Sequence, residues 1–194
     1  MMRRLSLLFA GLSLVAAQVG HAAPLHLAEV EVCFNYGCLS QWPVRFDVQR
    51  FEAVRLGLAK AASPEEERAR LAVAVGDLYA LAAEQTPIGR DRGGNYADAG
   101  VFGRMDCIDH ATTTTRFLRL LEQQGGLRWH RVLEPVRRVR GLIFQHYSAA
   151  IEVVGAAPDA PGQRFVVDSW FVDNGKPAVI LPLEAWMEGE GPDV

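Results

Sequence analysis

Gly103-Arg104-Met105-Asp106-Cys107-Ile108-Asp109-His110 is the stretch of this 194-residue chain that decides its fold. It places one cysteine, Cys107, between a glycine-rich loop and the first turn of a predicted helix. Unpaired backbone N–H groups and the positive end of the helix dipole favour a thiolate at such a position. A cysteine that only fills a core has no need of this place. We therefore take Cys107 as a candidate nucleophile.

The residues that follow predict a helix from Cys107 to about Gln124. Asp106 is a suitable N-cap, and Gly125-Gly126 is a typical stop. The threonine run 112–115 is a poor choice for an exposed helix, so it indicates a helix packed closely against a sheet.

The residues before Cys107 form a long segment, 85–106, that carries five glycines. A loop of this length inside a compact domain is usually functional or mobile. It leads directly to the cysteine, so we expect it to border the active site.

Strand-like segments dominate the C-terminal part of the chain, at 127–133, 142–154 and 164–172. A short strand at 178–181 and a last helical turn at 183–187 follow. Helices that precede strands in this way predict an α+β domain with an antiparallel sheet.

The N-terminal third predicts a hairpin and two helices. Alternating apolar and polar residues indicate a strand at 27–34 with a return at 42–46, followed by a helix at 47–60. Ser63-Pro64-Glu65-Glu66 is a strong helix start with a capping box, and that helix should run to about Glu84.

The first residues have the pattern of a secretory signal peptide. Arg3 and Arg4 precede an apolar run, Leu5 to Val19, and small residues favour cleavage after Ala22. The run is short for a membrane span, and an uncleaved anchor is the alternative. The sequence thus predicts a periplasmic or secreted protein without a membrane span after cleavage.

The mature chain, 23–194, has a length that suits a single domain. We divide it into an N-terminal hairpin with helices (23–84), an active-site loop (85–106) and a catalytic core (107–194). The net charge of −3 gives no indication of a nucleic-acid partner.

Export would allow Cys33 and Cys38 to form a disulfide across Phe34-Asn35-Tyr36-Gly37, a segment with turn-forming residues. Two free thiols are the alternative, since sequence alone cannot establish bridge geometry. With the bridge formed, Cys107 is the odd thiol left over.

Two later strands carry partners for this thiol. His146 lies in the strand pattern 145–153, and Asp168 lies in the otherwise apolar pattern 165–170, where a charged group needs a partner. On neighbouring antiparallel strands the two side chains would lie side by side. A helix N-terminus aimed at them would complete a nucleophile, a base and an orienting group.

With these three blocks in this order, the chain resembles the transglutaminase-like superfamily, and bacterial transglutaminase-like cysteine proteinases most of all. The papain-like core of that family carries Cys at a helix N-terminus, then His and Asp on successive strands. The blocks that carry the resemblance are 106–111 with the helix, its glycine stop and 128–132, then 146–153, and then 167–169. The resemblance covers about 103–170.

The resemblance implies a role for each residue of the triad. Cys107 would attack a carbonyl carbon, His146 would take its proton and later protonate the leaving amine, and Asp168 would hold the imidazole tautomer. The substrate would be a peptide, a protein or a peptidoglycan-derived amide, and no cofactor is implied. The oxyanion would be bound by the Cys107 N–H and by a second donor, for which Asn95 and Gln85 are candidates without support from a family motif.

A catalytically inactive envelope-binding or scaffold module is the alternative function. Asp106 and Asp109 flank the thiol, and their negative charges oppose a thiolate unless a protonated His146 lies beside it.

A zinc site is the main alternative chemistry, with Cys107 and His110 on one helical turn and His130 or His146 as a third ligand. No second short-spaced ligand pair exists, so we expect no metal. His110 is then expected to be a satisfied histidine at a helix surface or interdomain contact, and His130 to face solvent.

A calcium site at Asp91, Asn95 and Asp98 does not match the EF-hand spacing, so we interpret these residues as a solvated loop. A basic cluster is expected to be a solvated face that could also hold a substrate carboxylate. Its members are Arg128, Arg131, Arg137, Arg138 and Arg140.

Overall fold

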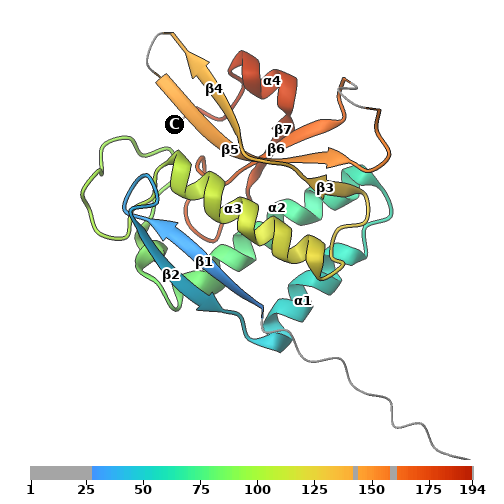
Figure 1. The fold of residues 1–194 in the computed structure, drawn as a ribbon, viewed down its shortest axis with the longest axis horizontal. Helices are drawn as coiled ribbons and strands as arrows, with labels where there is room; N and C mark the ends of the chain where they lie inside the picture. The colour runs from blue at the N-terminus through green and yellow to red at the C-terminus, as the bar shows by residue number, and fades with distance from the viewer. Residues whose placement is uncertain (1–27, 142–143, 158–160, 194) are drawn as a thin grey trace, which may run out of the picture.

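A computed structural model describes residues 28–141, 144–157 and 161–193. The predicted signal peptide lies outside these residues. Figure 1 shows helix α3 (Cys107–Gln123) crossing the middle of the molecule, between an N-terminal hairpin and a larger sheet. This arrangement is an α+β fold with antiparallel sheets, as the order of predicted elements indicated.

The N-terminal third forms the predicted hairpin and helices. Strands β1 (Glu29–Phe34) and β2 (Ser40–Arg45) pair antiparallel, and helices α1 (Val48–Ala59) and α2 (Pro64–Ala83) follow. The Ser63 hydroxyl caps α2 by accepting the Glu66 N–H at 3.2 Å. The Glu66 carboxylate accepts the Ala62 N–H instead of the Ser63 N–H that a capping box uses.

The larger sheet has five antiparallel strands arranged around β5 (Phe144–Val153). Both β4 (Val136–Arg140) and β3 (His130–Val132) pair with β5, β4 along its first half and β3 near its end. The opposite edge of β5 pairs with β6 (Arg164–Asp168), which pairs in turn with β7 (Val179–Pro182). The sequence did not predict β4, whose three arginines suggested a solvated cluster.

Two short helices complete the fold. The 3-10 helix η1 (Pro87–Arg90) interrupts the long segment before Cys107, and α4 (Leu183–Glu188) follows β7 as predicted. The chain from 91 to 106 has no helix or strand.

Helix α3 packs on both of its sides, against β1 of the hairpin and against β5 of the sheet. Its threonine run is buried as predicted from residue 113 onward, and the hydroxyls find partners. Thr113 accepts the Cys33 N–H at 3.0 Å, and Thr115 donates to the Ala111 carbonyl at 2.7 Å. These bonds satisfy the hydroxyls where a helix and two sheets meet, and they fix the direction of α3.

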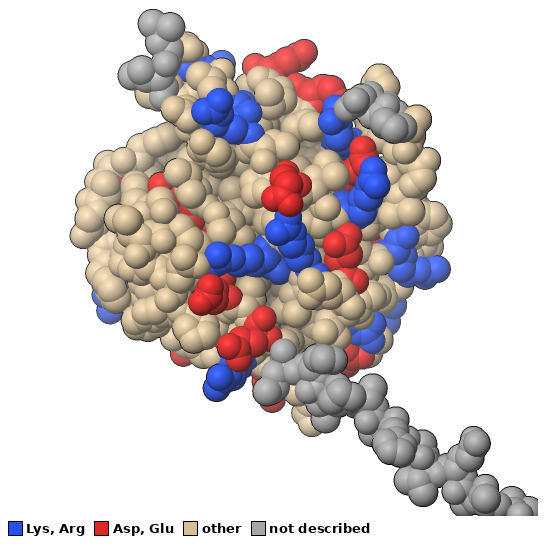
Figure 2. Space-filling view, in the orientation of Figure 1, with Lys and Arg blue, Asp and Glu red and all other residues tan. Residues whose placement is uncertain are grey.

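Figure 2 shows charges of both signs interspersed over the central and right-hand parts of one face, next to a largely uncharged area. Several arginines of the described residues form ion pairs, as Arg50 does with Glu84 and Arg70 with Glu66. Among the described residues, no helix is both long enough and apolar enough to cross a bilayer.

Candidate active site

Cys107 occupies the first position of α3, and a capping box holds it there. One Asp106 carboxylate oxygen accepts the N–H groups of Ile108 at 3.0 Å and Asp109 at 2.9 Å. The Asp109 carboxylate accepts the Asp106 N–H at 3.1 Å in return. Because both aspartates hold backbone groups, the start of the helix at Cys107 is rigidly defined.

The hairpin turn between β1 and β2 supports this capping box from outside. The predicted disulfide joins Cys33 and Cys38. Residues 35–38 all have φ between 58° and 68°, so four consecutive residues adopt the left-handed conformation. Successive N–H groups in such a turn point into one concave surface, which binds anions.

The anions held by this turn are the two aspartates near Cys107, Asp106 and Asp109. Asp109 accepts the N–H groups of Tyr36 at 2.8 Å and Cys38 at 2.6 Å, and Asp106 accepts that of Gly37 at 2.9 Å. The negative charges that appeared to oppose a thiolate are thus held by backbone donors. Burial is the main cause that raises the pKa of Asp109 to about 6, and the charge of Asp106 is the second. The backbone N–H groups that donate to Asp109 lower this pKa and so oppose the rise.

His146 and Asp168 are joined by a hydrogen bond of 2.7 Å between Nε2 and a carboxylate oxygen. They come from neighbouring strands, as predicted, but they are not directly opposite each other. The paired residues of β5 and β6 end at Ala149 and Val167. The two side chains therefore meet diagonally, beyond the last paired residues.

Two more donors bind the Asp168 carboxylate, which is only 1% exposed. The indole N–H of Trp186 reaches the oxygen that binds His146, at 3.0 Å, and the Trp170 N–H reaches the other oxygen at 3.2 Å. A buried carboxylate is costly unless such donors surround it. Sequence reasoning missed Trp186 in this role.

Aromatic rings fix the plane of the His146 imidazole. The ring centroids of Trp170, Phe171 and Trp186 lie 4.9, 5.3 and 5.6 Å from that of His146. Trp170 and Phe171, expected in the core or in a cleft wall, are buried here. The imidazole thus has a carboxylate at one nitrogen and walls that limit its rotation.

The Cys107 thiol is free and half-buried. Burial raises its pKa to about 11, and the charges of Asp106 and Asp168 act in the same direction. The backbone N–H of Tyr147, the residue after His146, acts against this rise, as does the N–H of Cys107 itself. The thiol therefore lies within electrostatic reach of both strands that carry its predicted partners.

A buried hydrogen-bond network lies one helical turn below the thiol. His110 bonds Asp91 through Nε2 at 2.9 Å and the Ser169 hydroxyl through Nδ1 at 2.8 Å. Ser169 also bonds Thr114 and Tyr79, at 2.8 and 3.2 Å. Since Ser169 follows Asp168, this network ties α3 to the aspartate strand. The expectation of a surface or interdomain position for His110 was wrong.

His130 is also buried, which corrects the expectation that it faces solvent. Its Nδ1 lies 2.7 Å from the Glu67 carboxylate, and its Nε2 lies 3.2 Å from an Arg68 guanidinium nitrogen. Both ring nitrogens of His110 and of His130 are therefore engaged. The zinc alternative would need a ring nitrogen of at least one of these two histidines as a ligand, together with the Cys107 thiolate.

The acidic residues of the long loop are engaged separately, not solvated together. Asp91 bonds His110 and accepts the Met105 N–H at 2.9 Å. Asp98 accepts the Tyr36 hydroxyl and pairs with Arg104 at 3.0 Å. They hold the loop against the hairpin turn and α3.

The two candidates for a second oxyanion donor have different partners. Both polar groups of the Gln85 amide bond the Arg45 backbone, at 3.0 and 3.1 Å, so Gln85 holds the end of β2. The Asn95 side-chain oxygen accepts the Ala97 N–H at 3.0 Å. A donor role for either amide nitrogen stays a prediction.

Gly93 and Gly94 attach the long loop to the segment that follows Asp168. The Gly94 N–H donates to the Trp170 carbonyl at 2.8 Å. A Cβ on Gly93 would lie 2.6 Å from the Phe171 carbonyl oxygen, so only glycine fits without a backbone shift. Gly93 thus permits the loop to lie close against the segment that follows Asp168.

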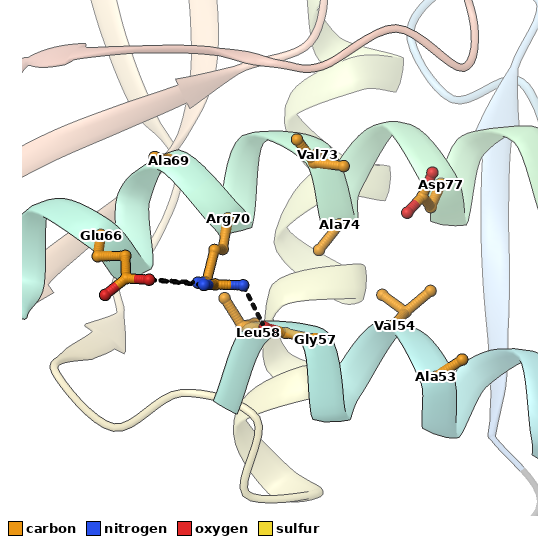
Figure 3. Close-up of a pocket in the computed structure, with 10 residues that line it drawn as sticks. All are labelled: Ala53, Val54, Gly57, Leu58, Glu66, Ala69, Arg70, Val73, Ala74 and Asp77. Atoms are coloured by element: carbon orange, nitrogen blue, oxygen red, sulfur yellow. Dashed lines mark hydrogen bonds and ion pairs between the residues drawn. The ribbon is translucent and has the colours of Figure 1, made fainter. Parts of the chain in front are cut away.

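A small cavity of about 110 Å³ opens beside His146. Its lining residues are Tyr96, Arg138, Arg140, Phe144, Gln145 and His146. A separate groove of about 370 Å³ lies between α1 and α2 and contains no residue of the predicted triad (Figure 3). In that groove Arg70 bonds Glu66 and the Gly57 carbonyl, so its polar groups serve the packing of the two helices.

No family model, no curated protein and no solved structure matches the chain.

Proposed function

We propose that this protein is an exported thiol enzyme with a transglutaminase-like core that cleaves or transfers amide bonds. The observation that supports this proposal best is the 2.7 Å bond between His146 and Asp168, located beside a free thiol at the first position of α3. A nucleophile, a base and an orienting carboxylate are the minimum for covalent acyl transfer.

The His146–Asp168 bond favours one direction of proton transfer. Asp168 accepts a hydrogen bond from the Nε2–H group, which leaves Nδ1 as the basic nitrogen of a neutral imidazole. Nδ1 takes the Cys107 proton while the sulfur attacks the substrate carbonyl carbon. The resulting imidazolium is stabilised by the buried carboxylate.

The tetrahedral oxyanion would be bound by the Cys107 N–H at the start of α3. As the C–N bond breaks, the imidazolium gives its proton to the leaving amine, and a thioester to Cys107 remains. Water or a second amine then attacks the thioester and restores the thiol. Hydrolysis and acyl transfer thus share every step but the last.

The raised pKa of Cys107 decides what the base must do. A thiol with a pKa of about 11 is almost wholly protonated near neutral pH. Activity therefore requires transfer of its proton to His146 during attack. The same raised pKa favours a second candidate, a catalytically inactive transglutaminase-like envelope module that keeps the triad for packing.

Export to the periplasm or the cell exterior is part of the proposal. The Cys33–Cys38 disulfide suits an oxidising compartment, where such bonds persist. The predicted substrates, peptides or peptidoglycan-derived amides, occur in the same compartment.

Alkylation of the mature protein, 23–194, with iodoacetamide near neutral pH tests the proposal. We expect fast labelling of Cys107, located by peptide mass mapping. His146→Ala should slow it by about 10- to 100-fold. Labelling of the unchanged protein no faster than that of a free thiol, and insensitive to His146→Ala, would favour the inactive module.

A further inference from the structure

The cavity beside His146 has a positively charged wall made by β4. In the register of β4 with β5, Arg138 lies opposite His146, and Arg140 lies opposite Phe144. Alternate residues of a strand share a face, so Arg138 and Arg140 project on the same side as the imidazole. All four residues line the cavity. Figure 2 shows basic side chains at the upper left, where Figure 1 places β4.

These two guanidinium groups have no carboxylate partner among residues 28–141, 144–157 and 161–193 within ion-pair distance. Arginines elsewhere do pair, as Arg131 does with Glu152 and Arg119 with Glu134. Two cations at one cavity create a local positive potential, although the charge of Asp168 acts on Arg138 and the whole chain has a net charge of −3.

The two arginines have different roles in this wall. Arg138 is buried, and its Nη1 donates to the Trp186 and Glu190 carbonyls at 2.5 and 2.9 Å. Its guanidinium carbon lies 4.6 Å from the centre of the Trp186 ring, the ring that also holds Asp168. Arg138 is therefore fixed in place, and it gives the cavity wall a positive charge that does not move.

Arg140 is exposed and lines the cavity. It rests on the backbone at Gly189, where an added Cβ would lie 2.8 Å from the guanidinium carbon. A guanidinium held on one face in this way keeps its edge donors for a ligand. Planar carboxylates match those donors in a two-point contact.

We propose that Arg140, supported by the charge of Arg138, forms a carboxylate-binding subsite for the leaving group of the reaction. This inference rests on the proposed function. The imidazole of His146 protonates the leaving amine, so the substituents on that nitrogen lie on the His146 side of the thiol. His146 also lines the cavity, which would place a carboxylate there on the residue that leaves as the amine.

The substrate class is therefore an amide bond whose amine side is an amino acid with a carboxylate, either the chain terminus or an acidic residue. The cavity volume of about 110 Å³ is several times larger than the roughly 30 Å³ that a water molecule occupies in the liquid. A carboxylate group therefore fits in the cavity. Phe144 and Tyr96, both largely exposed, would cover the apolar part of the leaving residue.

Two alkylating probes that differ only in charge test the subsite. N-iodoacetylglycine carries a carboxylate where N-iodoacetylglycinamide carries a neutral amide. We expect the acid to label Cys107 roughly five- to tenfold faster than the amide, the size of a partly solvated charge-assisted hydrogen bond. Arg140→Gln should bring the ratio of the two labelling rates close to one, and this ratio, not either rate alone, is the readout.

Arg137→Gln is the matched control, because it removes the same charge from the opposite face of β4. It should keep the preference, and Arg140→Lys should keep only part of it. Fast labelling by both probes with a ratio that Arg140→Gln does not alter would overturn the subsite alone. Labelling by the neutral probe that is no faster than in His146→Ala would overturn the proposed function and the subsite with it.

Discussion

One carboxylate oxygen of Asp168 binds both the imidazole Nε2 of His146, at 2.7 Å, and the indole N–H of Trp186, at 3.0 Å. The aspartate is thus held by His146 of β5 and by Trp186 of α4. The Trp170 N–H fixes its other oxygen. The orientation of His146 therefore depends on an anion that cannot turn without losing a bond in a buried environment.

Asp168→Asn should lower the rate at which Cys107 is alkylated by about 10- to 100-fold near neutral pH, because the imidazolium loses its counter-charge. Trp186→Phe is the matched comparison, since it removes one donor and keeps the charge, and its loss should be smaller. Both rates are measured by quenching the alkylation at a series of times and reading the labelled fraction by intact-protein mass spectrometry. Equal rates for Asp168→Asn and the unchanged protein would contradict the role of Asp168 as the orienting group.

The pH dependence of alkylation separates the action of the base from that of the thiol alone. Burial raises the pKa of Cys107 to about 11, so a thiol without a base should react about tenfold faster for each pH unit up to that value. We expect this steep rise in His146→Ala. In the unchanged protein the rate should rise less steeply with pH, because His146 accepts the thiol proton during attack.

The Cys33–Cys38 disulfide should stabilise the domain and the first turn of α3. Loss of a short cross-link of this kind costs about 2 kcal/mol, or a fall in Tm of about 4 to 8 °C for a chain of this size. Differential scanning calorimetry with and without a reductant measures the change. A variant with serine at both positions is the control, since the reductant should not lower its Tm further.

Reduction should also slow the alkylation of Cys107, because the turn at residues 35–38 holds the aspartates that cap α3. This effect is read at a temperature where both forms are folded. An unchanged rate would show that the turn serves stability alone.

Asp109 should make the domain less stable as the pH rises. Burial raises the pKa of Asp109 to about 6, above its ordinary value of 3.8. Its stabilising contribution is therefore complete below about pH 4 and is lost as the pH rises through 6. The full change is on the order of 2 to 3 kcal/mol. Urea unfolding at several pH values should show this loss in the unchanged protein and not in Asp109→Asn.

Much of the framework could be predicted from local patterns. Ser63 and Asp106 mark helix starts because a cap needs only neighbouring residues, and both cap as predicted. Strand-like sequence patterns identified the strands that carry His146 and Asp168. The predicted bond between these two side chains is present, because two neighbouring antiparallel strands bring their ends together.

The remainder depends on contacts between distant parts of the chain. Trp186 reaches Asp168 from the last helix, and no spacing rule links the two. Strand β4 was missed because Val136-Arg137-Arg138-Val139-Arg140 has few of the apolar residues by which strands are recognised. The burial of Arg138 depends on its bonds to the carbonyls of Trp186 and Glu190. The partners of Asp91 and Asp98 were missed because loop carboxylates are by default expected in water.

The left-handed turn at residues 35–38 links the Cys33–Cys38 disulfide to the start of α3. Its backbone N–H groups complete the cap of the helix that starts at Cys107, and a disulfide closes the turn. In a reducing cytoplasm that closure is absent, so the newly made chain would carry an incomplete cap beside its nucleophile. Under the proposed export and thiol chemistry, oxidation would complete this cap only outside the cytoplasm, where the disulfide persists.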